Sequence, residues 1–337
     1  MTAIKKRRLS STFLNDLKDG FLRELLKEVH NDETLSLEIR DDYLNIYYRG
    51  GSILRLTKEE RGYSTDFDDK YCCDKKDEQE FVQKDILPII SNMGNTDMLV
   101  DVFPRLKRIM DRWFIRHPKQ EREFQQLVVR ENNSKGIGKS TDYFIIDVEY
   151  DNRNKARFDM VAIEWESDKV LRKLPSNYKP KLCFIEMKYG DGALDSDEAP
   201  DGDGASDGDA GIKKHIEDMK KYFDSQGFDS IKEEMTELFK QKRELELIPA
   251  LVGNRNVLAH DQLADEVDYI FLLANHDPEK SVLCKVLQDV DKAYSHSLLG
   301  FNIRFCCSTF MGYGIYKQSV YSIQEFIQRF PKQILCE

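Results

Sequence analysis

Two charged side chains interrupt an apolar strand in the segment KLCFIEMKYGDG, residues 181–192, and their types could support chemistry. Strand residues alternate between two faces, so Glu186 and Lys188 point the same way while Ile185 and Met187 point the other way. Burying a carboxylate and an ammonium group side by side costs free energy unless they pair or serve a function. The pattern therefore marks Glu186 and Lys188 as candidates for acid–base or metal chemistry.

A third charged residue, Asp159, lies inside the apolar run ARFDMVAI at 156–163. Buried strands rarely carry an unpaired carboxylate. If the two strands are neighbours in one sheet, the carboxylates of Asp159 and Glu186 converge and repel each other. A divalent hard cation removes that cost, because Mg²⁺ is bound by one or two carboxylates, water and substrate phosphates. Lys188 would then lie beside a metal-bound water molecule.

Hydrophobic periodicity predicts the elements that must position these residues. The predicted strands of the second half are 143–151, 156–165, 181–190, 267–275 and 301–310. The predicted helices are 118–133, 211–224, 229–246, 281–290 and the closing segment YSIQEFIQRF. Alternating helices and strands of this kind imply a central mixed sheet flanked by helices.

The first third of the chain is expected to form a separate α+β layer. Apolar residues recur at helical spacing over 9–30 and again over 78–116. Between them, three short strand-like runs separated by Asp41-Asp42 and Gly50-Gly51 predict a three-stranded meander at 35–56. We expect an N-terminal α+β domain over 1–110, serving recognition, regulation or dimerisation, and a larger α/β domain over 111–337.

Composition excludes several classes of protein. The net charge of −10, from 51 basic and 61 acidic residues, disfavours a passive nucleic-acid coat protein. No window approaches the roughly 18 apolar residues of a membrane span. Seven cysteines without a CxxC pair disfavour a disulfide framework and a zinc site, and favour a reducing cytoplasm. GIGK at 136–139 lacks the spacing of a phosphate-binding P-loop, so ATP use is not indicated.

The order helix, strand, strand with Asp159, strand with Glu186-Met187-Lys188, then helix resembles the PD-(D/E)XK nuclease superfamily. The resemblance covers roughly 118–275 and departs at Phe158, where the family has proline. It implies a restriction-endonuclease-like α/β fold, with the central mixed sheet in 111–337. It also implies Mg²⁺, which Mn²⁺ can replace, held by Asp159, Glu186 and the backbone carbonyl of Met187. Lys188 would orient or deprotonate the attacking water.

Family members commonly add a glutamate from the helix before the first strand. PKQEREFQQLVVREN, at 118–132, offers Glu121, Glu123 and Glu131. Glu121 shares a helix face with apolar residues three and seven positions later and is the expected ligand, although an exposed helix acid explains it equally well. Asp147 and Glu149 are further acids on a neighbouring strand.

Two basic segments are candidates for binding nucleic acid. The segment 105–122 holds seven basic residues against two acidic ones, and Arg108, Arg112 and Arg116 are expected to form a phosphate-binding stripe. A basic helix face paired with the protein's own acids is the alternative. In GIKKHIEDMKKYF, Lys214 and His215 are expected phosphate contacts, whereas a surface helix with charge pairs explains the same residues. The other histidines are scattered and are interpreted as ordinary.

One segment, 191–211, has eight acidic residues and no basic ones among Gly, Ala and Ser. Its composition predicts a flexible insertion, and its aspartates lack the offsets of a calcium loop. An alternative is that it mimics a phosphate backbone and shields the neighbouring groove until substrate displaces it.

Three functional hypotheses follow from these observations. The favoured one is a metal-dependent nuclease acting on DNA, less readily on RNA, as a bacterial anti-phage or restriction-type effector in the cytoplasm. The second is a catalytically silent module that binds nucleic acid or protein, with Glu186–Lys188 or Asp159–Arg157 as buried ion pairs. The third is an effector whose N-terminal layer senses a partner or signal, with a homo-oligomer or partner protein as its context.

Overall fold

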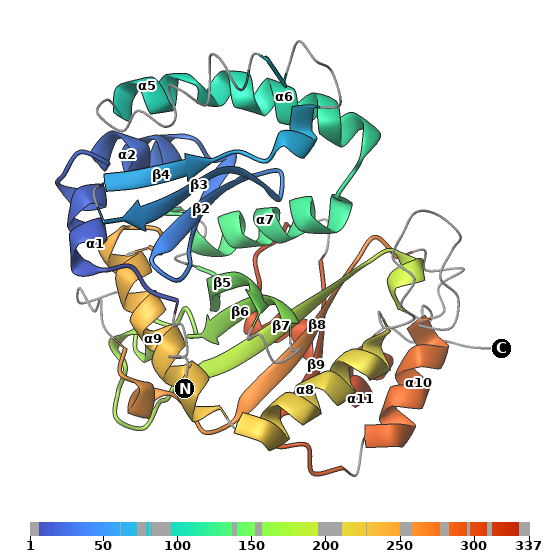
Figure 1. Cartoon of the computed structure of the whole chain (residues 1–337). Helices are drawn as coiled ribbons and strands as arrows, with labels where there is room; N and C mark the ends of the chain where they lie inside the picture. Colours follow the sequence, from blue (N-terminus) through green and yellow to red (C-terminus); the bar gives the residue numbers. More distant parts are fainter. Residues whose placement is uncertain are drawn as a thin grey trace. The chain divides into compact units, whose positions relative to one another are not determined.

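The described residues form a mixed α/β structure with two sheets, one of four strands and one of six (Figure 1). The computed structural model describes residues 7–60, 62–72, 79–80, 82, 96–136, 140–151, 157–194, 211–226, 228–249, 258–276, 283–294, 297–308 and 312–329. Packing divides the chain into two compact units, 1–130 with 234–250, and 131–233 with 251–337. These units are defined by packing, and the expected division into domains at 1–110 and 111–337 stays a prediction.

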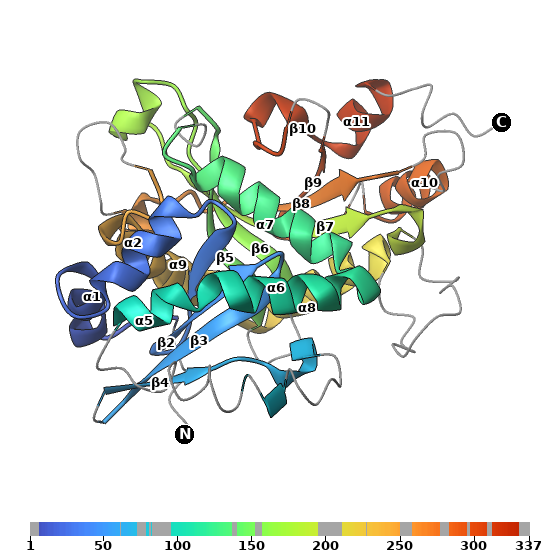
Figure 2. The same cartoon turned by 90° about the horizontal axis from the view of Figure 1, so that it is seen from above.

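The first unit is built on an antiparallel meander with the strand order β1-β2-β3-β4. The strands are β1 (Leu35–Ile39), β2 (Tyr43–Tyr48), β3 (Gly51–Glu59) and β4 (Gly62–Asp66). The helices are α1 (Ser11–Lys18), α2 (Arg23–Asn31), α5 (Thr96–Asp101), α6 (Phe103–Arg116) and the start of α7 (Gln120–Asn133). Within this unit α5 and α6 run along one side of the sheet (Figures 1 and 2).

Two sequence predictions for this unit are corrected by the structure. The meander has a fourth strand, β4, which the polar segment GYSTD concealed. The helix expected over 9–30 is two helices that meet at a turn around Gly20. A Cβ at Gly20 would lie 2.6 Å from the Cα of Asp16, so the chain folds back too closely for any larger residue.

A buried ion pair links distant parts of the first unit. Lys242 lies in α9 (Asp229–Glu244), and its Nζ donates to Glu38 Oε2 in β1 at 2.7 Å. Both side chains are 1% exposed. Both charges are shielded from water, and each offsets part of the cost of burying the other.

The second unit is built on the six-stranded mixed sheet, ordered β10-β9-β8-β7-β6-β5. The strands are β5 (Tyr143–Asp151), β6 (Arg157–Glu164), β7 (Lys181–Tyr189), β8 (Val267–Ala274), β9 (Asn302–Cys307) and β10 (Val320–Tyr321). β7, β8 and β9 are parallel, and the other neighbours are antiparallel. Five of the six strands were predicted. β10, only two residues long, was missed, and Figure 2 shows it at the edge next to β9.

Helix α8 (Ile212–Gln226) covers one face of this sheet in Figure 1, and α10 (Leu283–Tyr294) packs beside it. Aromatic rings fill the space under α8: Phe158 lies 4.5 Å from Phe184 and 5.7 Å from Tyr222 between ring centroids, and Tyr269 lies 6.1 Å from Phe158. These rings belong to β6, β7, α8 and β8, so the core fixes the position of the strands that carry the candidate site.

Other expectations were met or lie outside the described residues. The helices predicted over 118–133, 211–224, 229–246 and 281–290 and at the C-terminal end correspond to α7, α8, α9, α10 and α11 (Ile323–Arg329). Most of the acidic segment 191–211, and Ile137 to Lys139 of GIGK, lie outside the described residues. In the part of the chain that the structure describes, no helix is long and apolar enough to cross a membrane.

Candidate active site

Glu186 and Lys188 lie on β7, the central strand of the second unit, and form a buried ion pair. Lys188 Nζ donates to Glu186 Oε1 at 3.1 Å, and the side chains are 5% and 7% exposed. Both point toward the α8 face, because they alternate with Ile185 and Met187 and keep the parity of Phe184. The predicted strand and its two same-facing charges are therefore confirmed.

His215 of α8 reaches the same carboxylate. Its Nε2 lies 3.2 Å from Glu186 Oε1, the oxygen that Lys188 also contacts. The sequence prediction placed His215 against a phosphate, and the structure places it beside the central acid of the site. A lysine and an imidazole thus converge on one carboxylate oxygen, in surroundings where electrostatic interactions are stronger than in water.

Asp159 joins this group from β6. The backbone pairing between β6 and β7 ends at Met160–Ile185 and does not extend to Asp159, the residue that precedes Met160. Beyond this point the Asp159 side chain connects the two strands, because its Oδ2 accepts a hydrogen bond of 2.7 Å from the backbone N–H of Met187. The first acid therefore contacts the residue between Glu186 and Lys188.

Tyr269 gives an independent sign that the two acids share one environment. This ring lies fully buried on β8, in register with Phe184. Burial raises the pKa of Tyr269 well above its usual range, and the negative charges of Glu186, Asp159 and Asp218 add to the effect. Asp159 and Glu186 therefore both lie near enough to Tyr269 to act on its hydroxyl group, while their convergence on one metal ion stays a prediction.

The donor set suits a hard divalent cation. Carboxylate oxygens such as those of Asp159 and Glu186 are ligands that Mg²⁺ prefers. The contact described for Met187 is its N–H group, so its carbonyl as a metal ligand stays a prediction. Glu121 is half-buried on α7 in the first unit, and its role as a ligand also stays a prediction.

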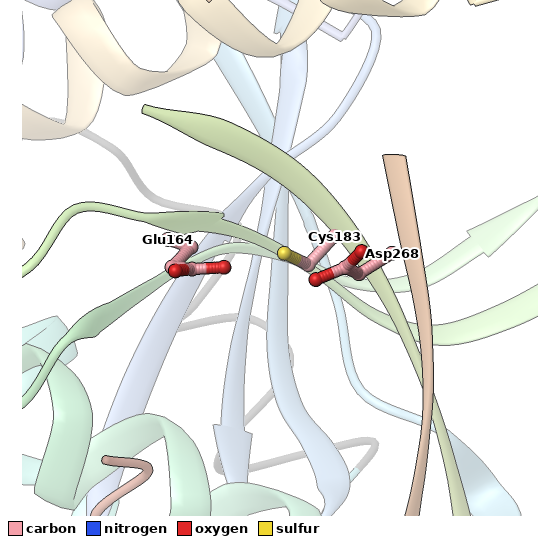
Figure 3. Close-up of side chains that lie close together, drawn as sticks. All are labelled: Glu164, Cys183 and Asp268. Atoms are coloured by element: carbon pink, nitrogen blue, oxygen red, sulfur yellow. The ribbon is translucent and has the colours of Figure 1, made fainter. Parts of the chain in front are cut away.

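A second cluster lies on the opposite face of the same sheet. Figure 3 shows Glu164 of β6, Cys183 of β7 and Asp268 of β8, whose ligand atoms all lie within 4.8 Å of one another. Cys183 and Asp268 are direct partners in the parallel ladder, and all three residues are buried. This cluster was not predicted from the sequence, although Asp268 interrupts the apolar run VDYIFLLAN just as Asp159 interrupts its own strand.

Basic side chains already neutralise this second cluster. Lys181 Nζ lies 3.2 Å from Asp268 Oδ2 and 4.0 Å from Glu164 Oε2. Asp268 is also contacted by Asn302 at 2.8 Å and by Arg304 at 3.9 Å, while Lys317 lies 3.9 Å from Glu164. The acids have cationic partners without a metal ion, so the arrangement is that of a buried ion network.

The pKa values in this network follow from burial and charge. Burial raises the pKa of Glu164, although Lys181 acts in the opposite direction. Burial by itself would lower the pKa of Lys181, but attraction by Asp268 and Glu164 outweighs burial and raises it. Burial, with Asp268 and Glu164, raises the pKa of the Cys183 thiol well above its usual range. Without a bound metal, Cys183 is therefore a neutral thiol at physiological pH, which makes it a poor nucleophile.

The predicted phosphate-binding stripe lies on α6 of the first unit. Arg108, Arg112 and Arg116 are all exposed, at helical spacings of four. Two other charged residues of the helix turn inward: Lys107 pairs with Asp32, and Asp111 with Arg49 at 2.9 Å. The stripe is therefore an exposed basic face.

The remaining candidates have local partners. Lys214 lies 3.4 Å from Asp218 one helical turn later, which is the surface charge pair that was the alternative to a phosphate contact. Arg157 Nε lies 3.4 Å from Asp151. Asp147 is fully buried and its Oδ1 accepts from the N–H of Val148 at 2.9 Å, whereas Glu149 is half-buried with a φ of 52°.

One histidine that the sequence analysis interpreted as ordinary lies next to the site. His276, two residues beyond β8, places Nε2 3.1 Å from the carbonyl oxygen of Lys188 and Nδ1 3.2 Å from Asp191 Oδ1. Nothing in its sequence spacing distinguishes His276, because its partners are 85 and 88 positions away.

No family model, curated protein or solved structure matches this chain.

Proposed function

We propose that the protein is a metal-dependent phosphodiesterase that hydrolyses nucleic acid, with DNA as the favoured substrate and RNA as the alternative. The observation that carries the proposal is that Asp159 of β6 contacts the backbone N–H of Met187, the residue between the paired Glu186 and Lys188 of β7. Two acids and one amine in this arrangement are the groups that hydrolysis of a phosphodiester requires.

Asp159 and Glu186 would hold Mg²⁺. When bound, the ion would acidify a water ligand and offset the charge of the scissile phosphate. The chain's own contribution is to keep both carboxylates together and to hold the Lys188 ammonium group beside them. From there Lys188 can orient the attacking water and stabilise the negative charge that develops on phosphorus.

The order of elements supports a restriction-endonuclease-like arrangement for the second unit. Helix α7 precedes the antiparallel strands β5, β6 and β7, and α8 follows the strand that carries Glu186 and Lys188 before the chain enters the parallel strand β8. The first unit would supply substrate affinity through the exposed arginines of α6, since contacts to phosphate carry most sequence-independent binding.

Cleavage of plasmid, linear duplex and single-stranded DNA, and of RNA, in Mg²⁺ or Mn²⁺ tests this function. Lys188→Ala should reduce the rate on the order of 10²–10⁴-fold, because a positioned acid–base group is lost. Lys213→Ala is the matched control: this lysine lies on α8, is half exposed and pairs with Asp289 at 3.2 Å. Equal cleavage by Lys188→Ala and wild-type protein would contradict the proposal.

The second candidate is a silent binding module, favoured by the fact that Glu186 and Lys188 already satisfy each other as a buried pair. Such a module would bind DNA or a protein without cleaving it and without needing a metal. Mg²⁺ titration followed by thermal unfolding separates the two functions, because a ligand that binds only the folded state raises its stability.

A further inference from the structure

Two polar side chains meet where β7 and β8 end side by side. Asp191 follows the end of β7 by two residues, and His276 follows the end of β8 by two. The two chain segments are joined there by a backbone hydrogen bond of 2.9 Å from Gly190 N–H to the carbonyl of Ala274. Gly190 has a φ of 77°, so the chain turns sharply immediately after the strand that carries Lys188.

His276 holds both sides of this turn. Its Nδ1 lies 3.2 Å from the Asp191 carboxylate, and its Nε2 lies 3.1 Å from the Lys188 carbonyl oxygen. Both partners are hydrogen-bond acceptors, so the two contacts are hydrogen bonds at the same time only when the ring carries a hydrogen on each nitrogen. The His276 side chain is only 10% exposed, so water competes little for these contacts.

The atom that His276 contacts belongs to the residue that the proposed mechanism needs most. The backbone of Lys188 sets the direction in which its side chain leaves the strand and so the distance from its Nζ to Glu186. Lys188 is one residue from the end of β7, where strand pairing to β6 has already stopped at Ile185. A misplacement of about 1 Å at a reacting group can cost on the order of 10²-fold in rate.

We propose that Asp191 and His276 are positioning residues for Lys188: Asp191 orients the imidazole, and His276 Nε2 holds the Lys188 carbonyl. This inference rests on the proposed function. A carboxylate that contacts one ring nitrogen of a histidine fixes the orientation of the other nitrogen. Here the second nitrogen faces a carbonyl oxygen, so its role is to fix a backbone rather than to bind a metal or substrate.

Two conservative variants separate the two contacts of His276. A glutamine amide can reach the place of Nε2 and donate to the Lys188 carbonyl, whereas an asparagine amide reaches only the place of Nδ1. His276→Asn should lower kcat for DNA cleavage about 10–100-fold, with the Kd for duplex DNA and the Tm unchanged. His276→Gln should stay within about 3-fold of wild type. His260→Asn, at an exposed position, is the control.

Amide hydrogen exchange measures the same contact whether or not the protein cleaves DNA. In His276→Asn, exchange at Tyr189 and Gly190 should accelerate about tenfold or more, because the end of β7 opens more often. In His276→Gln it should stay near the wild-type rate. Wild-type exchange in His276→Asn overturns the inference, and so does faster exchange with unchanged kcat, which would make the pair structural only.

The two proposals fail in different ways. If Lys188→Ala cleaves DNA as fast as wild type, or if wild type does not cleave, the proposed function is wrong and the exchange data alone decide whether His276 holds the turn. If Lys188→Ala is inactive and His276→Asn is fully active, the proposed function stands and the positioning role is wrong.

Discussion

The two faces of the six-stranded sheet carry similar groups of residues, placed at opposite ends of the strands β7 and β8. On the α8 face, Asp159 and Glu186 lie with Lys188 and His215 toward the carboxyl ends of β7 and β8. On the other face, Glu164 and Asp268 lie with Lys181 and Cys183 near the start of the same strands. Both groups combine two acids, one lysine and a fourth polar side chain within a buried sheet.

The difference lies in where the partners of each acid come from. Asp268 receives Asn302 on Oδ1 and Lys181 and Arg304 on Oδ2, and all three partners belong to strands of the sheet. Glu186 receives Lys188 from its own strand and, on the same oxygen Oε1, His215 from helix α8. Strand residues that pair with one another form a structural network, whereas on the α8 face the acid also meets a side chain from a helix.

The largest expected effect is on activity, through matched substitutions on the two faces. Glu186→Gln should reduce DNA cleavage on the order of 10²–10⁴-fold, since it removes a charge that the metal and Lys188 need. Cys183→Ser, on the other face of the same strand, should leave the cleavage rate within about 3-fold of wild type at a temperature where both are folded. A plasmid-nicking time course distinguishes the two, and equal loss in both variants would remove the functional contrast between the faces.

The next effect is on stability. Lys181→Met should lower the free energy of unfolding by about 3 kcal/mol, near the low end for breaking a buried pair because Asn302 and Arg304 still contact Asp268. Urea denaturation measures it, with the half-exposed Lys213→Met as control. A loss no larger than in the control would show that the network is not stabilising.

The stability lost in Lys181→Met should depend on pH, because the pKa values of Lys181 and Glu164 are shifted. The pKa of Lys181 is raised, so its contribution is complete below its ordinary value near 10.5 and is lost as pH rises through the folded value. The pKa of Glu164 is also raised, so this carboxyl takes up a proton above its usual range and then needs no ammonium partner. The cost of Lys181→Met should therefore be full at neutral pH and shrink toward pH 4.

A smaller effect is expected from metal binding. Mg²⁺ at ten times its Kd should stabilise the wild-type protein by about 1.4 kcal/mol, seen as a rise of a few degrees in Tm. Asp159→Asn should lose most of this rise, while Asp268→Asn, compared with its own metal-free Tm, should keep it. If instead Asp268→Asn abolishes the shift, the metal binds on the face with Cys183.

The smallest effect concerns thiol chemistry. Cys183 is fully buried with a pKa raised well above its usual range, whereas Cys307 is only half-buried and burial raises its pKa to about 11. At pH 8 an alkylating reagent should modify Cys307 slowly and leave Cys183 intact. Peptide mass mapping measures the ratio, and rapid labelling of Cys183 would show that this face of the sheet is open.

The sequence was enough to predict β6 and β7, the strands that carry Asp159, Glu186 and Lys188. The runs around Asp159 and Glu186 combine strand-forming side chains with a charge that a buried strand rarely tolerates, and both signals are local. Pairing of the two strands could be expected because they are neighbours along the chain.

What could not be predicted depends on register between distant segments. His276 contacts Lys188 only because β8 is parallel to β7 with Lys188 opposite Leu273. The Glu164–Asp268 cluster likewise forms only when β6, β7 and β8 are aligned. The one signal in the sequence was Asp268, the single acid in the apolar run VDYIFLLAN. Gly20 separates two helices through a close backbone approach that hydrophobic periodicity does not reveal.

The buried pair of Glu38 and Lys242 sets a timetable for synthesis of the protein. Its partners are 204 positions apart, so at ribosomal speeds of about 5–20 residues per second roughly 10–40 s pass between their appearances. Throughout that interval Glu38 of the meander lacks the ammonium group of Lys242. A fragment ending before Lys242 would never gain this contact, so the first unit is completed only after β5, β6 and β7 of the second unit have been made.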